Sequence, residues 1–266
     1  AGMAGPNMDA YNAVAHGLTT MPTGGFSPQA RSIEAFSAAV QWVIIPFMVL
    51  AGTNFALIWH ALSGSPEKLW NDTEFRGYIG AMAVLTAIIT GLLFTGGFAT
   101  GVPEGATFDA AYLQQYAGMI SGTLEPSLRH ALFQAVSIVT TTGYASMDFD
   151  IWGAPAQYAL LFGMFIGGSA GSTGGGIKII RWIVVAKALR RELFTTAHPE
   201  AVRPVRLGGS ALDDTAIRGI FAFTLLYLTV FFLGALVLAL DVARAGAGFT
   251  VLEVVSGTAS TLGNVG

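Results

Sequence analysis

The feature that most constrains the fold is a short apolar helix that runs into a turn of threonine and glycine. It lies at residues 129–144 and reads RHALFQAVSIVTTTGY. At about 1.5 Å of rise per residue, a helix over residues 127–140 covers only about 20 Å, less than the roughly 30 Å hydrocarbon core of a bilayer. A helix that crosses only part of the membrane must be followed by non-helical backbone that returns to the same side. Such backbone is stable at membrane depth only where it is buried in protein or lines a water-filled cavity. The turn fits a cavity, because threonine and glycine offer carbonyl oxygens without bulk, as in selectivity filters.

The rest of the composition is that of a polytopic, all-α membrane protein. Hydrophobic residues make up 53% of the chain and charged residues 11%, with a mean hydropathy of +0.61. Apolar runs at residues 32–62, 78–98, 156–188 and 217–240 are predicted to be membrane spans. The net charge of −3 gives no support for nucleic-acid binding, and the absence of cysteine excludes disulfides and thiolate chemistry.

The basic residues are unevenly distributed and predict the orientation. Eight of the thirteen lie between Lys178 and Arg218, whereas residues 100–126 contain none. By the positive-inside rule, the connector at residues 190–214 is cytoplasmic and the loop at residues 100–126 is external. The threonine–glycine turn then opens toward the outside.

Similar helix–turn units occur three times, and this repetition predicts the architecture. The glycines that close the turns, Gly25, Gly143 and Gly266, are 118 and 123 residues apart, with two predicted spans between successive turns. The last unit is less regular, because Ser137 precedes Gly143 by six residues whereas Ser256 precedes Gly266 by ten, so Gly263 is an alternative. We expect a portion of a four-repeat pore that lacks the first filter and the final span.

Five motifs carry a resemblance to a known family. They are HGLTTMPTGGFSP at residues 16–28, AGTNFALIWHAL at 51–62, FQAVSIVTTTGYAS at 133–146, GMFIGGSAGSTGGGIKIIR at 163–181 and the weaker STLGNVG at 260–266. They resemble the Trk/Ktr/HKT superfamily of prokaryotic and plant potassium transporters, most closely the bacterial and archaeal TrkH-like pore subunits, and the resemblance extends over nearly the whole chain. A lone TTGY turn would be a weak signal, but its combination with the glycine-rich segment and Ile-Lys is specific.

The resemblance implies tandem M1–pore helix–M2 repeats around a central pore. It divides the chain into residues 1–62 (pore helix, filter, M2), 75–194 (M1, pore helix, filter, interrupted M2) and 212–266 (M1, pore helix, start of a filter). The filter residues that would bind K⁺ through their carbonyls are Thr23, Gly24, Gly25, Thr141, Thr142, Gly143, Asn264, Val265 and Gly266. No cofactor is implied.

The glycine-rich segment inside the third apolar run is expected to be two half-helices joined by a coil, because each glycine costs a helix about 1 kcal/mol relative to alanine. By resemblance it is a gating loop beneath the filter, formed by Gly167, Gly168, Ser169, Gly171, Ser172, Thr173, Gly174, Gly175, Gly176 and Lys178. A plain kink is the alternative. A nucleotide P-loop does not fit, because it would need the run Gly-Lys-Ser/Thr, which this segment lacks. Lys178 either opposes K⁺ at the cytoplasmic mouth or snorkels to the interface.

The resemblance also implies gated K⁺ uptake across the prokaryotic plasma (inner) membrane by a homodimer embedded in the lipid bilayer. A cytoplasmic nucleotide-binding regulatory subunit, similar to TrkA or KtrA, would dock on the basic surface that includes Arg190, Arg191, Arg203 and Arg206.

Other polar residues have a functional and a structural interpretation. Asp148 and Asp150 either concentrate cations at the external mouth or belong to a solvated loop. His16 and His60 are expected to be ordinary helix or interface histidines, since no second ligand stands at metal spacing. Asn54 is expected to hydrogen-bond between helices.

Three other functions remain as alternatives. One is a Na⁺/K⁺ transporter of the same family, because the missing first filter bears on selectivity. Another is a broken-helix secondary transporter, which would direct half-helix N-termini at its substrate. The third is a non-conducting structural fragment. Nothing in the sequence suggests an enzyme, since no Ser/His/Asp set or paired carboxylates stand out.

Overall fold

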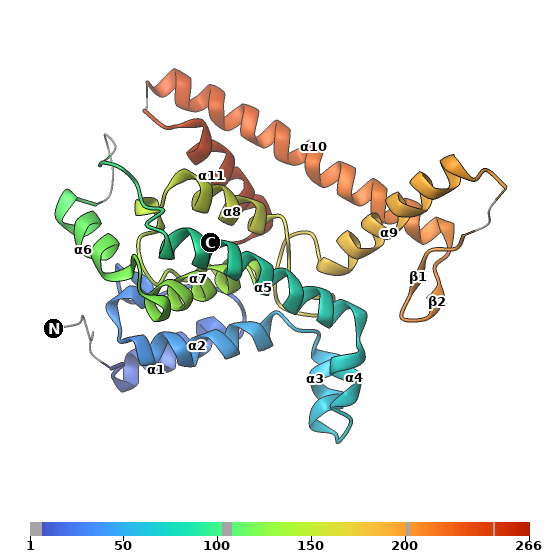
Figure 1. Cartoon of the computed structure of the whole chain (residues 1–266), viewed down its shortest axis with the longest axis horizontal. Coiled ribbons are helices and arrows are strands. Elements are labelled where there is room, and N and C mark those ends of the chain that lie inside the picture. The colour runs from blue at the N-terminus through green and yellow to red at the C-terminus, as the bar shows by residue number, and fades with distance from the viewer. Residues whose placement is uncertain (1–6, 103–107, 201–202, 247) are drawn as a thin grey trace.

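In the computed structural model, the regular elements of the described residues are helices and one short β-hairpin (Figure 1). The structure describes residues 7–102, 108–200, 203–246 and 248–266. Residues 1–6 of the first predicted unit, and residues 103–107 of the predicted external loop, lie outside the described residues.

The first predicted unit contains three α-helices and one 3₁₀-helix. They are α1 (Ala10–Thr20), η1 (Ser32–Ala35), α2 (Ala38–Ala51) and α3 (Phe55–Leu62). The apolar run at residues 32–62 is not one straight helix, because α2 and α3 are bent by 106° at the break between them, as in a broken span or a re-entrant loop. The break has a local cause: Gly52 ends α2, and the Asn54 side chain caps α3 by accepting from the Ala56 N–H at 2.8 Å.

The second predicted unit contains the central helices. After α4 (Glu67–Asn71) in the connector come α5 (Thr73–Phe94), α6 (Ala110–Ile120), α7 (Leu124–Val139), η2 (Phe149–Ile151), α8 (Ala154–Met164) and α9 (Ile179–Ala197). Helix α6 was not expected in the loop at residues 100–126. It begins where the Asp109 carboxylate accepts from the Tyr112 N–H at 2.8 Å, which is an N-cap. The coil between α8 and α9 agrees with two half-helices separated by glycines.

The third predicted unit follows a β-hairpin of β1 (Arg206–Leu207) and β2 (Ser210–Ala211). It contains α10 (Asp214–Ala245) and α11 (Val251–Gly263). Helix α10 ends at Gly246 in the left-handed conformation, and α11 begins with a capping box between Thr250 and Glu253. The division of the chain into three units stays a prediction.

Among the described residues, two helices are long and apolar enough to cross a membrane, namely α5 and α10. The bent pair of α2 and α3 passes the same test only if it counts as one span. Helix α7 has 16 residues, which corresponds to a length of about 24 Å and is still short of a hydrocarbon core.

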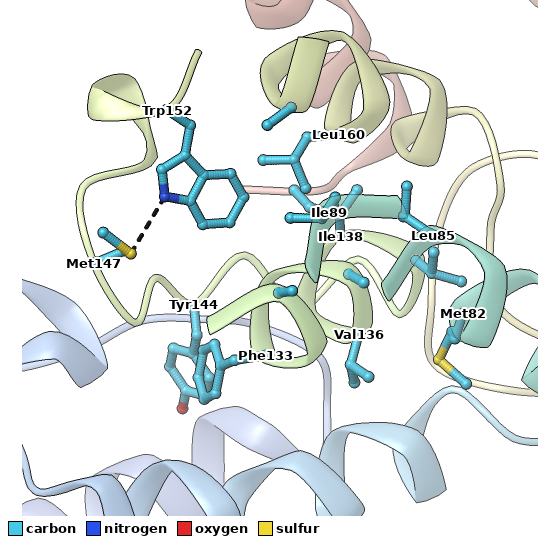
Figure 2. Close-up of a cluster of buried hydrophobic side chains, with 14 of the residues drawn as sticks. Met82, Leu85, Ile89, Phe133, Val136, Ile138, Tyr144, Met147, Trp152 and Leu160 are labelled. Atoms are coloured by element: carbon cyan, nitrogen blue, oxygen red, sulfur yellow. Dashed lines mark hydrogen bonds between the residues drawn. The ribbon is translucent and has the colours of Figure 1, made fainter. Parts of the chain in front are cut away.

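Helix α7 lies at the centre of the core, in contact with α2, α5, α6 and α8 (Figure 1). Figure 2 shows the apolar cluster around it, with Ile138 and Val136 on α7 and Ile89 and Leu85 on α5. Near-continuous burial along α7 holds its C-terminal end, and the turn that follows, in one position.

Candidate functional site

Three turns with the same backbone conformation follow α1, α7 and α11. We call them the first turn (residues 23–25), the second turn (141–143) and the third turn (264–266). Each opens on a non-glycine residue in the left-handed region and closes on a glycine with positive φ. The φ angles are 55° at Thr23, 57° at Thr141 and 55° at Asn264, then 66° at Gly25, 82° at Gly143 and 116° at Gly266.

Each turn is hydrogen-bonded back to the last part of its own helix. The N–H groups of Gly24, Thr142 and Val265 donate to the carbonyls of Thr19, Ser137 and Ser260 at 2.9, 2.8 and 2.9 Å. The hydroxyls of the same three helix residues donate to carbonyls at or just beyond the turn, those of Phe26, Tyr144 and Gly266, at 2.9, 2.7 and 2.6 Å. The turns are therefore equivalent in backbone conformation and in their N–H bonds to the helices, while the hydroxyl of Ser260 bonds one residue earlier than those of Thr19 and Ser137.

This equivalence decides between the two glycines considered for the third turn. Gly266 stands six residues after Ser260, as Gly143 stands six after Ser137, whereas Gly263 is the last residue of α11. The spacing in the third unit is irregular only when it is measured from Ser256 instead of Ser260.

The three turns converge so closely that no side chain fits between them. A Cβ atom on Gly143 would lie 2.9 Å from the Cα of Gly266, and one on Gly25 would lie 2.9 Å from the carbonyl carbon of Thr142. Such approaches explain why glycine occupies these positions.

Several carbonyls of the turns have no protein partner. Within the described residues, no hydrogen bond uses the carbonyl oxygens of Gly24, Thr142 or Val265, although Thr142 and Val265 are each only 1% exposed. Buried carbonyls are normally paired, so these oxygens are available to a cation or water.

A hydrogen-bonded network supports the backbone that leaves the second turn. The Ser146 N–H donates to the Gln134 side chain at 3.2 Å, and the Ser146 hydroxyl lies 2.9 Å from Nδ1 of His130. The Arg129 guanidinium donates to Glu125 at 2.8 Å and to Gln41. These side chains, except those of Gln134 and Glu125, line a polar cavity of about 320 Å³ beside α7.

The loop at residues 165–178, which we call the glycine-rich loop, lies against all three turns. The Thr173 hydroxyl is 3.3 Å from the Met21 carbonyl, just before the first turn. The Gly175 N–H donates to the Thr141 hydroxyl at 2.6 Å, and a Cβ on Gly175 would lie 3.2 Å from the Cβ of Asn264.

The same loop is seated on the bend between α2 and α3. The N–H of Ser169 donates to the Gly52 carbonyl at 2.9 Å, and the Phe55 N–H donates to the Gly171 carbonyl at 3.2 Å. From the start of α5, the buried Glu74 carboxylate accepts from the Ala170 N–H at 2.6 Å. Glu74 escaped the sequence analysis, although a carboxylate in the first turn of an apolar span was a visible signal.

Other predicted residues are placed as follows. Lys178 turns back into the loop and donates to the Gly174 carbonyl. His16 is buried, with Nδ1 2.7 Å from the Asn12 carbonyl and Nε2 2.9 Å from the Ser27 hydroxyl, while His60 is exposed. Asn54 caps α3, and its side chain makes no hydrogen bond to another helix among the described residues, so the expected interhelical role is wrong.

The acidic residues after the second turn lie close together. The Asp150 N–H donates to the Asp148 carboxylate at 3.0 Å. Burial raises the pKa of Asp150, and repulsion from Asp148 and from Glu253 raises it further. Among the described residues, no three His, Asp or Glu side chains are grouped to hold a metal ion.

Some of the arginines on the predicted cytoplasmic surface interact with other side chains. Arg191 forms ion pairs with Asp214 and Glu192 at 2.9 and 3.0 Å, and Arg203 lies 4.9 Å above the Phe194 ring.

The chain matches known proteins along nearly its whole length. The family model for TrkH, described as a cation transport protein, matches residues 4–266. The Trk system potassium uptake protein TrkH of Escherichia coli strain K12 is 33% identical over 261 residues, covering 97% of this chain and 48% of that protein. TrkI of Halomonas elongata, a Trk system potassium uptake protein, is also 33% identical, with 97% and 47% covered.

A solved structure agrees with these relatives. The crystal structure of the potassium transporter TrkH from Vibrio parahaemolyticus matches with a TM-score of 0.80 and 33% identity, covering 97% of this chain and 50% of that one. The chain thus spans about half the length of the proteins that it resembles.

Proposed function

Because this chain belongs to the TrkH family of cation transport proteins, we propose that it is part of the ion-conducting subunit of a Trk-type K⁺ uptake system. The subunit would lie in the prokaryotic plasma (inner) membrane. The relatives named above are potassium uptake proteins, and K⁺ is the transported ion rather than a cofactor.

The observation that carries the proposal is the convergence of three turns with unpaired carbonyls. The buried carbonyls of Thr142 and Val265, together with that of Gly24, would replace the water oxygens around a dehydrated K⁺. Helices α1, α7 and α11 each end at a turn, so the negative ends of their dipoles favour a cation there.

The proposed binding set is the nine residues of the three turns. These are Thr23, Gly24, Gly25, Thr141, Thr142, Gly143, Asn264, Val265 and Gly266.

The glycine-rich loop is proposed to be the gate. It lies against the cytoplasmic side of the three turns, given the orientation inferred from charge, and would have to move before an ion could leave the filter. Its bonds to Thr141, Glu74 and Gly52 would hold the closed position, and its glycines make a second conformation accessible.

The assembly is also a proposal. A homodimer and a cytoplasmic nucleotide-binding partner fit the family, and that partner would dock on the basic surface around α9 and the β-hairpin. Of the four arginines predicted for this surface, Arg190, Arg203 and Arg206 have no ion pair among the described residues.

The direction of the helices favours a pore over the broken-helix transporter. Such a transporter would direct helix N-termini at an anionic substrate, whereas here the C-termini of α1, α7 and α11 meet. A Na⁺/K⁺ transporter of the same family remains the second candidate, and the flux experiment distinguishes it.

The experiment is a comparison of Rb⁺ and Na⁺ tracer flux through proteoliposomes that contain the transporter with this chain. We expect Rb⁺ to dominate in the wild type and Gly143→Ser to lose that preference, because the side chain would clash with the third turn. Gly118→Ser is the matched control, since Gly118 lies on α6 with open space around it. Equal flux of both ions in the wild type would favour the Na⁺/K⁺ transporter, and no flux would refute the pore.

A further inference from the structure

We propose that Tyr144 is a positioning residue that ties the second turn to the helix of the first turn and thereby sets ion selectivity. The proposal rests on the proposed function, since it concerns the same turns.

The Tyr144 side chain crosses from one predicted unit to another. It is fully buried, and its hydroxyl lies 2.6 Å from the Thr19 hydroxyl, 3.2 Å from the Thr20 hydroxyl and 3.2 Å from the His16 carbonyl. All three partners belong to the last two turns of α1. In Figure 2 the Tyr144 hydroxyl is directed away from α7, toward the blue ribbon of the N-terminal segment.

The contact continues to the backbone just beyond the first turn. The Thr20 hydroxyl donates to the His16 carbonyl at 2.6 Å, which leaves its lone pairs as acceptors. The one proton of the Thr19 hydroxyl is shared between the carbonyls of Phe26 at 2.9 Å and Ala15 at 3.0 Å, and its lone pairs can accept from Tyr144. A chain of two hydrogen bonds therefore runs from Tyr144 through Thr19 to the residue that follows Gly25.

Backbone contacts at the next residue add to this tie. The carbonyl of Ala145 accepts from the Glu34 N–H at 3.1 Å, and the Ala145 N–H donates to the Ser32 hydroxyl at 3.3 Å. The segment that leaves the second turn is thus also attached to the first unit immediately after Tyr144. Phe26 holds the position after the first turn that Tyr144 holds after the second. It cannot form an equivalent tie, because it has no hydroxyl and is 76% exposed.

The consequence for ion binding is geometric. The carbonyls of two neighbouring turns discriminate between cations only if their separation is held while an ion passes. Each turn is fixed to its own helix by Thr19 or Ser137, but those bonds leave the spacing between helices free. Tyr144 supplies a direct bond between the two, in a buried place where water does not compete.

The test uses Tyr144→Phe, which keeps the ring and removes only the hydroxyl. We expect the Rb⁺/Na⁺ flux ratio to fall about two- to tenfold, the range that one hydrogen bond represents. Thr19→Val should give at least the same fall, because it also removes the bond to the Phe26 carbonyl, and Thr19→Ser should retain the wild-type ratio. The double variant Tyr144→Phe, Thr19→Val should be no worse than Thr19→Val alone.

Tyr227→Phe is the matched control, because the Tyr227 hydroxyl is buried and has no hydrogen-bond partner among the described residues. Thermal unfolding of each variant separates a loss of packing from a loss of selectivity. If the wild type is selective and Tyr144→Phe leaves the Rb⁺/Na⁺ flux ratio unchanged, this proposal alone is overturned. The same holds if the variant lowers only the melting temperature. An unselective wild type overturns the proposed function, and this proposal with it.

Discussion

The Thr141 hydroxyl accepts a hydrogen bond from the Gly175 N–H at 2.6 Å, so the second turn and the glycine-rich loop are in direct contact. Thr141 is 1% exposed and its φ is 57°, which holds the side chain in a fixed direction below the turn. A proposed ion-binding residue is thus also an anchor of the proposed gate.

Removing the hydroxyl should therefore loosen the gate. In Thr141→Ala the Gly175 N–H loses its partner, and an unsatisfied buried donor costs about 1–3 kcal/mol. We expect the fraction of open transporter to rise about tenfold, measured as Rb⁺ flux without activation. Thr141→Ser retains the hydroxyl and should behave as wild type; equal leak in both variants would contradict the role of this bond.

A second anchor of the loop is Glu74, whose carboxylate accepts from the Ala170 N–H. Glu74→Gln keeps the shape but removes the charge, and charge-assisted hydrogen bonds are worth about 1 kcal/mol more than neutral ones. We expect about fivefold more basal Rb⁺ flux with an unchanged Rb⁺/Na⁺ ratio, since among the described residues the Glu74 carboxylate has no hydrogen bond to a turn. Glu67→Gln, in the exposed α4, is the control. A changed ratio would show that Glu74 acts on the filter instead.

The helices and turns were largely predictable because their signals are local. Short apolar runs before threonine–glycine turns predicted the positions of α7 and its turn, and the glycines predicted the break between α8 and α9. The sequence failed at residues 32–62, where composition alone cannot reveal that Gly52 ends one helix and Asn54 starts the next at 106°.

The contacts between distant segments could not be read from the sequence. Glu74 and Ala170 are 96 residues apart, and Tyr144 and Thr19 are 125 apart. The first pair forms within the second unit and the second pair joins two units, and both depend on packing between segments far apart in the sequence. The equivalence of Ser260 with Ser137 was present in the spacing but was obscured by the nearby Ser256.

The close approach of the turns makes a stability prediction for Gly25. Gly25→Ala adds a Cβ at a φ of 66° and against the Thr142 carbonyl, so it incurs both backbone strain and a clash. Gly208→Ala is a matched control with a φ of 56° and open space in the β-hairpin. We expect the control to lower stability by about 1 kcal/mol, as strain alone does, with the flux ratio unchanged.

For Gly25→Ala we expect a larger fall in the melting temperature and a loss of Rb⁺ preference. Both variants would be compared by thermal unfolding and tracer flux. If the two melt alike and remain selective, the first turn does not approach the second as closely as the structure shows.

The half-buried carboxyl of Asp150 makes a prediction about external pH. Burial and the repulsion of Asp148 and Glu253 raise its pKa, so Asp150 is protonated at a higher pH than an ordinary aspartate. As the external pH falls toward that raised pKa, the negative charge near the second turn is lost, and we expect Rb⁺ influx to fall about twofold. Asp150→Asn should begin at the lower rate and lose this pH dependence.

Acid unfolding through Asp150 would not explain this loss of Rb⁺ influx at low pH. A pKa that is higher in the folded state than in the unfolded state means that the folded protein binds the proton more tightly. This group therefore adds to the free energy of unfolding as the pH falls through its raised pKa. The measurement is Rb⁺ influx at a series of external pH values with the internal pH fixed. A pH profile in Asp150→Asn that is identical to the wild type would show that the decline belongs to another group.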